Sequence, residues 1–297
     1  MVIRFLVTAF FIFSILSCTD NEKQNTEETI GKFSSVEATK EYFRWQESAP
    51  RLISAHRGGP YPGYPENSIE AFNNVLENTE AIIECDVAVT RDGMLIMMHD
   101  DKLDRTTTGA GLVNKKTWEE IKSLKLKDYN NQVTEFSIPS LEEVLNWSKG
   151  KAFLTLDIKR GVSLEKVNEL ISKTGTAANV AIITYSFKKA KEVHQINPDL
   201  MISITARNMD DIKRIKESGI AIDNLIAFTG ISELDKEVYD ALHEMGIYAM
   251  LGALGNLDRR AQARGDSYYI TLYARGADIL ATDRPIEVAG QLRQPTN

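Results

Sequence analysis

Ala81-Ile-Ile-Glu-Cys-Asp-Val-Ala-Val89 is the longest of a series of short apolar runs that predict β-strands in this chain. The run is rich in β-branched residues, which favour strands. Successive strand side chains point to opposite faces, so Glu84 and Asp86 share one face and Cys85 points away from both. Carboxylates inside an apolar strand are costly without a partner. The stretch therefore predicts a buried strand that carries two carboxylates toward a functional site, with Cys85 as an inert buried thiol.

Seven further runs of the same kind lie along the chain, separated by segments with helical periodicity. The eight predicted strands are Leu52–Ala55, Ala81–Val89, Phe153–Ile158, Val180–Tyr185, Leu200–Thr205, Leu225–Phe228, Ile247–Leu251 and Asp278–Thr282. An additional strand, Met94–Met98, follows the turn Arg91-Asp92-Gly93 and is expected to form a hairpin with the second strand.

Helices are predicted in the intervals between these strands. They are Glu66–Asn78, Leu141–Ser148, Leu164–Lys173, Lys188–Ile196, Met209–Ser218, Glu233–Met245 and Arg259–Arg275. Regular alternation of strand and helix predicts an α/β protein with a parallel sheet, here a TIM (β/α)8 barrel, which needs about 250 residues. The segment Asp100–Pro139, with one helical piece at Thr117–Leu124, is predicted to be a short insertion after the second strand, over the mouth of the barrel.

The N-terminus has the pattern of an export signal. Arg4 precedes the apolar run Phe5–Leu16, which has the length of a secretory signal and is short for a membrane span. The run ends in Ile15-Leu16-Ser17-Cys18, which resembles a bacterial lipobox. We therefore expect residues 1–17 to be a lipoprotein signal peptide, Cys18 to be lipidated, residues 18–35 to be a flexible tether and residues 36–297 to form the barrel. A plain signal peptide and an uncleaved anchor are the alternatives.

These expectations place the protein in the cell envelope, held to a membrane by a lipid anchor and either periplasmic or on the cell surface. Of the 297 residues, 43% are hydrophobic and 26% charged, as in ordinary globular proteins. The formal net charge of -7 disfavours a nucleic-acid partner, because such partners favour a basic face.

Polar residues that can carry chemistry follow the first three predicted strands and the hairpin strand. In a TIM barrel the carboxyl ends of the strands line the active site. His56 and Arg57 leave the first strand, Glu84 and Asp86 share one face near the end of the second, His99 ends the hairpin strand, and Asp157 and Lys159 share one face at the end of the third. We expect these side chains to meet at one site, whereas His194 and His243 lie within predicted helices and are expected to be structural.

The residue types at these strand ends suit metal-assisted phosphoryl chemistry. Glu84, Asp86 and Asp157 offer only oxygen ligands, which favours one hard divalent cation, Ca²⁺ or Mg²⁺. Arg57 and Lys159 add positive charge suited to a phosphate. His56 and His99 supply an acid and a base that titrate near neutral pH.

Several ordered motifs resemble those of the glycerophosphodiester phosphodiesterase family. They are Ser54-Ala-His-Arg-Gly-Gly59, Pro65-Glu-Asn-Ser-Ile-Glu-Ala-Phe72, Glu84-Cys-Asp-Val87, Met98-His-Asp100, Leu103-Asp-Arg-Thr-Thr107, Ile138-Pro-Ser-Leu-Glu-Glu-Val-Leu145, Leu156-Asp-Ile-Lys159 and Ala277-Asp-Ile-Leu-Ala-Thr-Asp-Arg-Pro285. The resemblance runs from Leu52 to Pro285 and implies a metal-dependent TIM barrel that hydrolyses glycerophosphodiesters to glycerol 3-phosphate and an alcohol.

The resemblance also implies roles for individual residues. His56 and His99 would be the general acid and base, and Arg57 and Lys159 would contact the phosphate. The metal ligands would be Glu84, Asp86 and Asp157. Glu66 and Asn67 would order the loop after the first strand or support the metal ligands. The implied route has the neighbouring hydroxyl of the substrate attack phosphorus, after which water opens the cyclic phosphate.

One position and one segment differ from the family pattern. Asp157 stands where the family more often has Glu, and the late Trp-Thr-Val-Asn segment is replaced by Ala249-Met-Leu-Gly-Ala-Leu-Gly-Asn256. Asn256 is a loose substitute for the missing asparagine, and the head group accepted stays open. Two other interpretations also stay open: a phospholipid head-group phosphodiesterase or lyase that forms a cyclic phosphate, and a non-catalytic binding lipoprotein.

Overall fold

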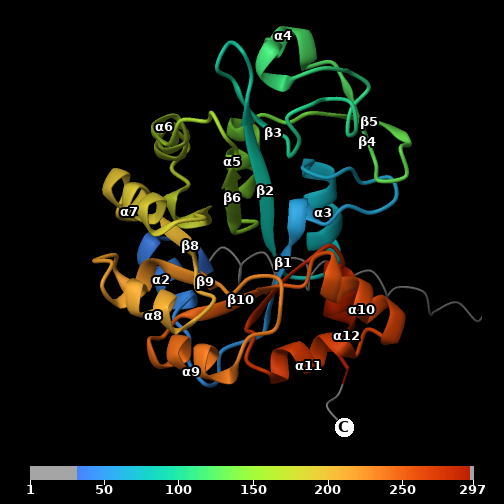
Figure 1. The fold of residues 1–297 in the computed structure, drawn as a ribbon. Coiled ribbons are helices and arrows are strands. Elements are labelled where there is room, and N and C mark those ends of the chain that lie inside the picture. Colours follow the sequence, from blue (N-terminus) through green and yellow to red (C-terminus); the bar gives the residue numbers. More distant parts are fainter. Residues whose placement is uncertain (1–31, 295–297) are drawn as a thin grey trace, which may run out of the picture.

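A closed barrel of eight parallel strands forms the centre of the computed structural model, which describes residues 32–294 (Figure 1). The barrel strands are β1 Leu52–Ala55, β2 Ile82–Val89, β6 Leu154–Ile158, β7 Val180–Ile183, β8 Met201–Thr205, β9 Leu225–Phe228, β10 Tyr248–Gly252 and β11 Ile279–Thr282. Each strand pairs in parallel with the next, and β1 closes the ring by pairing with both β11 and β2. The TIM barrel predicted from the sequence is confirmed.

Side chains alternate between the barrel interior and the surrounding helices, as strand geometry requires. Ile83, Cys85 and Val87 of β2 pack in the large outer core, whereas Ile82 packs in an interior cluster with Phe153 and Met201. Glu84 and Asp86 therefore project inside the barrel above Ile82. This interior layer closes the bottom of the barrel and leaves the acidic residues at its mouth.

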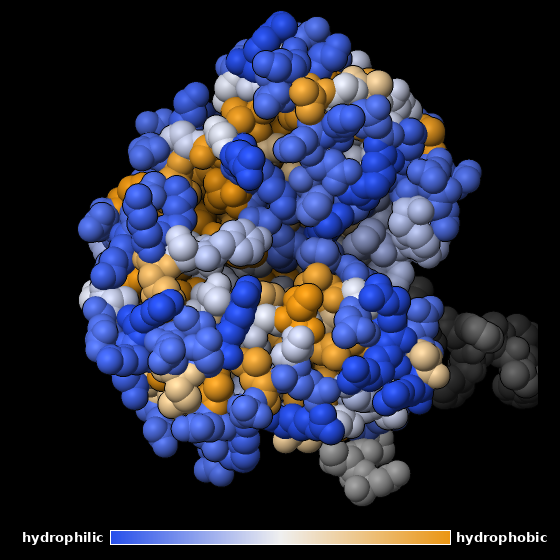
Figure 2. Space-filling view, viewed as in Figure 1, coloured by the Kyte–Doolittle hydropathy of each residue, from blue (hydrophilic) through white to orange (hydrophobic). Residues whose placement is uncertain are grey.

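The helices lie outside the barrel and bury one face each. They are α3 Ile69–Asn78, α5 Leu141–Ser148, α6 Leu164–Thr174, α7 Phe187–Ile196, α8 Met209–Lys216, α9 Lys236–Glu244, α10 Asn256–Arg264, α11 Tyr268–Ala274 and α12 Pro285–Leu292. Most of the face shown in Figure 2 is hydrophilic, with hydrophobic side chains exposed in scattered patches.

Three predicted helices differ clearly from those observed. The predicted helix Glu233–Met245 begins only at Lys236. The predicted helix Glu66–Asn78 begins only at Ile69, because Asn67 is left-handed (φ 58°) and the Ser68 side chain caps the helix by accepting from the Ala71 amide. The predicted helix Arg259–Arg275 is two helices, α10 and α11. Gly265, whose φ is 105°, ends the first of them.

The insertion lies beside the loop that follows β1, at the mouth of the barrel. It follows β3 Leu95–Met97, which pairs antiparallel with β2 as predicted. It holds α4 Trp118–Ile121, shorter than the predicted helix, and the strands β4 Lys125–Lys127 and β5 Val133–Ser137, which were not predicted. Leu103, Val113, Ile121, Leu126 and Ile138 form a small core that continues onto Ala88 of β2, Ile96 of β3 and Met98. The Gly63 amide donates to Asp128 Oδ2 (2.9 Å) and ties the insertion to the β1 loop.

The bottom of the barrel is covered by the segment before β1. Helix α2 Val36–Tyr42 is capped by Ser35 and leads into Phe43, which is buried against Phe153 and Tyr248. Trp45 stacks on His243 with ring centroids 3.9 Å apart, and both rings hydrogen-bond Asp278. Within residues 32–294 no helix has the length and apolar character that crossing a membrane requires.

Candidate active site

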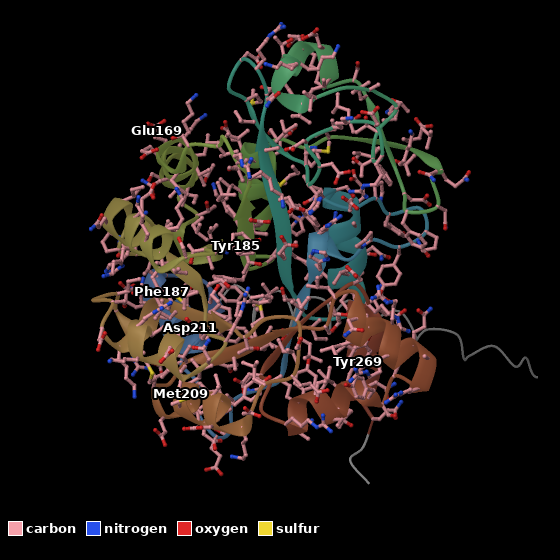
Figure 3. All side chains as sticks on the ribbon, viewed as in Figure 1. Glu169, Tyr185, Phe187, Met209, Asp211 and Tyr269 are labelled. Atoms are coloured by element: carbon pink, nitrogen blue, oxygen red, sulfur yellow. The ribbon has the colours of Figure 1, made fainter. Side chains whose placement is uncertain are left out.

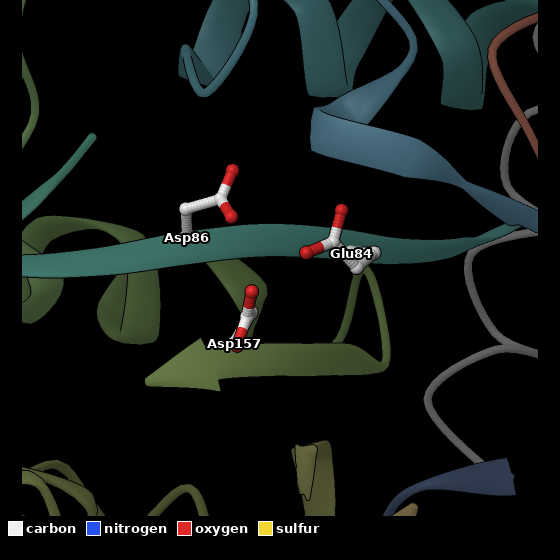
Figure 4. A group of neighbouring side chains, drawn as sticks. All are labelled: Glu84, Asp86 and Asp157. Atoms are coloured by element: carbon white, nitrogen blue, oxygen red, sulfur yellow. The ribbon is translucent and has the colours of Figure 1, made fainter. Parts of the chain in front are cut away.

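Three carboxylates meet inside the mouth of the barrel (Figure 4). Glu84 and Asp86 come from β2, and Asp157 comes from the paired position of β6, since Asp86 and Asp157 are register partners. Each residue offers an oxygen within 4.8 Å of those of the other two. The residues are only 8%, 1% and 8% exposed, respectively. The two strands thus bring together the three acidic residues singled out from the sequence.

Lys159 is the cation nearest to these carboxylates. Its Nζ lies 2.6 Å from Asp86 Oδ1 and 2.7 Å from Asp157 Oδ2. Burial lowers the pKa of Lys159, but the negative charges of Asp86 and Asp157 and their hydrogen bonds together outweigh this, so the net shift is upward. Burial and the charge of Asp86 raise the pKa of Glu84. Three buried carboxylates with one ammonium therefore leave negative charge that is only partly compensated.

The charge and donor set fit a divalent cation. The three side chains supply oxygen ligands from two rigid strands, and oxygen ligands suit Ca²⁺ and Mg²⁺. A bound cation would offset the repulsion that raises the pKa of Glu84. Glu84, Asp86 and Asp157 are therefore the residues that would hold it.

Arg57 holds a strained backbone conformation directly after His56. It is left-handed (φ 53°), which is uncommon for a residue other than glycine. This turn aims the Arg57 amide at Glu84 Oε2, 2.6 Å away. Gly58 follows, and a Cβ there would lie 2.1 Å from the ring of Phe72, so only glycine fits. Arg57 Nε is buried and has no hydrogen-bond partner among the described residues.

Glu66 and Asn67 lie between β1 and α3, as Arg57 does, and both contact residues of the site. Asn67 Nδ2 donates to Asp86 Oδ2 (2.7 Å), and the Asp86 amide donates to Asn67 Oδ1 (2.8 Å). This reciprocal pair fixes both the side chain and the backbone of Asp86. Glu66 accepts from Arg57 Nη1 with both oxygens at 3.2 Å. The two residues therefore support a carboxylate of the triad and the side chain of Arg57.

His56 is held by a carboxylate from the other end of the chain. Its Nδ1 lies 2.6 Å from Oδ1 of Asp283, which directly follows β11. Burial lowers the pKa of His56, but the hydrogen bond with Asp283 and the charge of Glu84 outweigh it, so the pKa is raised above its ordinary value. The Asp283 amide in turn donates to Asp258 Oδ2 (2.8 Å), and Asp258 is buried.

His99 is held in the same way. Its Nδ1 lies 2.8 Å from Oδ1 of Asp100. Two bonds from Arg105 to Asp100 keep the pKa of that carboxyl well below its usual range. With Nδ1 engaged in each ring, Nε2 is the nitrogen that both histidines keep for a substrate. A matched pair of oriented imidazoles can give and take a proton.

Sequence reasoning missed four residues that the structure adds to this site. Asp283 ends the eighth strand, so the strand-end argument applied to His56 would have found it. Asp100 follows His99 directly. Arg105 lies within the family-like motif Leu103–Thr107, to which the sequence assigned no role. Tyr185, labelled in Figure 3, follows β7. Desolvation and the negative charge of Asp157 raise the pKa of its hydroxyl, although the residue is 68% exposed.

The segment Ala249–Asn256, which differs from the family's Trp-Thr-Val-Asn pattern, forms most of β10 and the turn after it. A Cβ at Gly252 would lie 3.0 Å from Ile231 Cγ2 and 3.1 Å from Phe228 Cζ, so Ile231 and Phe228 fill the space beside this position. Asn256 is the first residue of α10. Cys85 is buried as expected, and Cys18 lies outside the described residues.

Comparison with known proteins agrees with this geometry. Residues 56–283 match the glycerophosphoryl diester phosphodiesterase family. A glycerophosphodiester phosphodiesterase of Caldanaerobacter subterraneus is 35% identical over 160 residues, which are 52% of this chain and 65% of the relative. One from Bacillus subtilis is 32% identical over 193 residues, 54% of this chain and 65% of the relative. The chain thus matches just under two thirds of the length of each.

A crystal structure provides the longer match. A glycerophosphoryl diester phosphodiesterase from Parabacteroides distasonis superposes with a TM-score of 0.81 and 33% sequence identity. The superposition covers 87% of this chain and 91% of that protein.

Proposed function

Because the chain belongs to the glycerophosphoryl diester phosphodiesterase family, we propose that it is a metal-dependent phosphodiesterase that hydrolyses small glycerophosphodiesters to glycerol 3-phosphate and an alcohol. The observation that carries this proposal is the matched pair His56–Asp283 and His99–Asp100 at a barrel mouth that also holds three buried carboxylates. The names of the relatives support the substrate class.

The proposed reaction needs one proton removed and one delivered. One imidazole Nε2 takes the proton of the substrate hydroxyl next to the phosphodiester while that oxygen attacks phosphorus. The other imidazolium gives its proton to the departing alcohol oxygen, which leaves a cyclic phosphate. Water then opens the ring with the two histidines in exchanged roles, and glycerol 3-phosphate is formed.

Charge on the phosphoryl oxygens is balanced by cations of the site. Arg57 and Lys159 are the chain's own cations there, and Glu66 and the two acidic partners of Lys159 hold their positions. A divalent cation held by Glu84, Asp86 and Asp157 supplies Lewis-acid stabilisation of the same charge when it is bound.

The envelope location forms a second part of the proposal. The lipobox-like sequence ending at Cys18 supports a signal peptide over residues 1–17, a lipidated Cys18 and a tether over 18–35. The enzyme would then act beside a membrane, in the periplasm or on the cell surface. Intact-mass analysis of the membrane-extracted protein tests this. The expected mass begins at a lipidated Cys18, and an unmodified chain that retains residues 1–17 would refute it.

The activity is tested with the full-length chain in detergent. Glycerophosphocholine and glycerophosphoethanolamine are incubated with Ca²⁺, with Mg²⁺ or with EDTA, and glycerol 3-phosphate is measured. We expect release with a divalent cation and loss of release with EDTA. A stable cyclic phosphate would favour the lyase. Binding of substrate without turnover in every condition would favour the non-catalytic lipoprotein.

A further inference from the structure

Arg105 joins the two halves of the site from the insertion. Its guanidinium holds Asp100 through Nε (2.7 Å) and Nη2 (2.9 Å). The same group holds Glu66 through Nη1 and Nη2, both at 2.8 Å. One side chain thus makes a two-bond contact with each of two carboxylates, the strongest geometry available to an arginine. Asp100 and Glu66 come from different loops and are connected by it.

Each of these carboxylates also holds a residue of the proposed reaction. Asp100 Oδ1 lies 2.8 Å from His99 Nδ1, and Glu66 accepts from Arg57 Nη1. A continuous chain of contacts therefore runs from His99 through Arg105 to Arg57. Its far end reaches the acidic cluster, since the Arg57 amide donates to Glu84.

The backbone that carries Arg105 is fixed by the insertion core. Leu103 is buried in that core, and the Thr107 amide and hydroxyl both donate to the Leu103 carbonyl (3.0 and 2.7 Å). The Thr106 hydroxyl donates to Met98 Sδ, one residue before His99. The turn 103–107 is therefore a rigid support, and the guanidinium reaches the site from a defined point.

Neither a substrate-binding role nor a stabilising role explains this arrangement well. Four of the five N–H groups of Arg105 face the two carboxylates, so its charge is already matched and little donor capacity is left for a phosphate. Its side chain is 47% exposed, so even in two-bond geometry its ion pairs add only modestly to folding stability. The remaining role for Arg105 is to orient Asp100 and Glu66, and through them His99 and Arg57.

We propose that Arg105 is a positioning residue for the phosphodiester reaction, which orients His99 through Asp100 and Arg57 through Glu66. The inference rests on the proposed function. The insertion then has a catalytic purpose, since it carries the residue that sets the relative placement of a proton-transfer group and a phosphate-binding group. Small displacements of such groups reduce turnover strongly.

Variants of the full-length protein test this. Arg105→Gln is expected to lower kcat by about 10- to 100-fold with only a small change in the urea midpoint. Arg105→Lys, which keeps the charge but not the planar fork, should recover only part of the loss. Arg91→Gln is the matched control. Arg91 is 58% exposed and binds Glu120 and the Lys115 carbonyl of the same insertion, away from the site. We expect it to retain wild-type kinetics.

A double-mutant cycle separates positioning from independent effects. If Arg105 acts through Asp100, Asp100→Asn combined with Arg105→Gln should cost little more than the larger single loss. Losses that multiply would overturn the proposal, as would an Arg105→Gln enzyme within about twofold of wild type.

Nitrogen-15 NMR of the His99 ring tests whether Arg105 orients His99 without any measurement of turnover. In wild type we expect one fixed tautomer with the proton on Nδ1, and in Arg105→Gln a mixed tautomer signal. An unchanged His99 signal would contradict the inference. Absence of turnover in wild type with this NMR change present would instead contradict only the proposed function.

Discussion

His56 Nδ1 lies 2.6 Å from Asp283 Oδ1, and this contact joins the ends of the first and last strands of the barrel. The contact leaves Nε2 of His56 for the substrate. Together with the charge of Glu84, it also outweighs the effect of burial, which alone would lower the pKa of His56.

Asp283→Asn removes the negative charge that strengthens the bond to His56 and raises the pKa of its ring. The pKa should therefore fall, and the limb of the pH–rate profile that belongs to His56 should move to lower pH. If His56 is the acid, activity is lost at a lower pH on the alkaline side; if it is the base, activity persists further on the acidic side. Asp266→Asn is the control, because Asp266 binds Arg284 and not His56. An unshifted profile in Asp283→Asn would contradict the assignment.

His56→Ala and His99→Ala should each lower kcat by at least ~10²-fold, the scale of a lost acid or base. His194→Ala is the matched control, since His194 lies in α7 and was expected to be structural. Steady-state kinetics on glycerophosphocholine measure the effect. Either variant with wild-type turnover would refute its role.

Metal binding can be measured without activity. Adding Ca²⁺ or Mg²⁺ should raise the Tm, because a ligand that binds only the folded chain stabilises it. In Glu84→Gln and Asp157→Asn this increase should be largely lost. Asp211→Asn, which changes a buried acid at the start of α8, should keep it. An equal increase in all four proteins would place the cation elsewhere.

Asp278→Ala tests the segment that covers the bottom of the barrel. The Asp278 carboxylate accepts from Trp45 Nε1 (2.9 Å) and from the Ala249 amide (2.7 Å), and lies 2.9 Å from His243 Nε2. Loss of this largely buried group should reduce the free energy of unfolding by about 2–4 kcal/mol. Asp223→Ala removes an exposed pair with Arg44 and should cost less than about 1 kcal/mol. Urea unfolding compares the two, and equal losses would contradict the account.

The strands and the acidic cluster could be predicted because their signals are local. Each strand is a short apolar run, and alternation alone puts Glu84 and Asp86 on one face. The break between α10 and α11 was missed because apolar residues resume at Tyr268, although the intervening Gly265-Asp-Ser267 is a turn signal. The contacts of Phe43, which follows α2, could not be predicted, because its partners Phe153 and Tyr248 lie far along the chain.

Arg105 shows why part of the site stays beyond sequence reasoning. Its partner Glu66 is 39 positions away, and both residues lie in polar loops without periodicity. Only the folded insertion brings them together. Asp283, by contrast, could have been found by applying the strand-end rule to the eighth strand.

Phosphorus-31 NMR of glycerophosphocholine incubated with the full-length protein and a divalent cation tests the central claim most directly. The account predicts that the diester signal is replaced by that of glycerol 3-phosphate, and that neither His56→Ala nor an EDTA-treated sample gives this change at a comparable rate. A diester signal that persists with every cation, or one that disappears equally fast with His56→Ala, would contradict it.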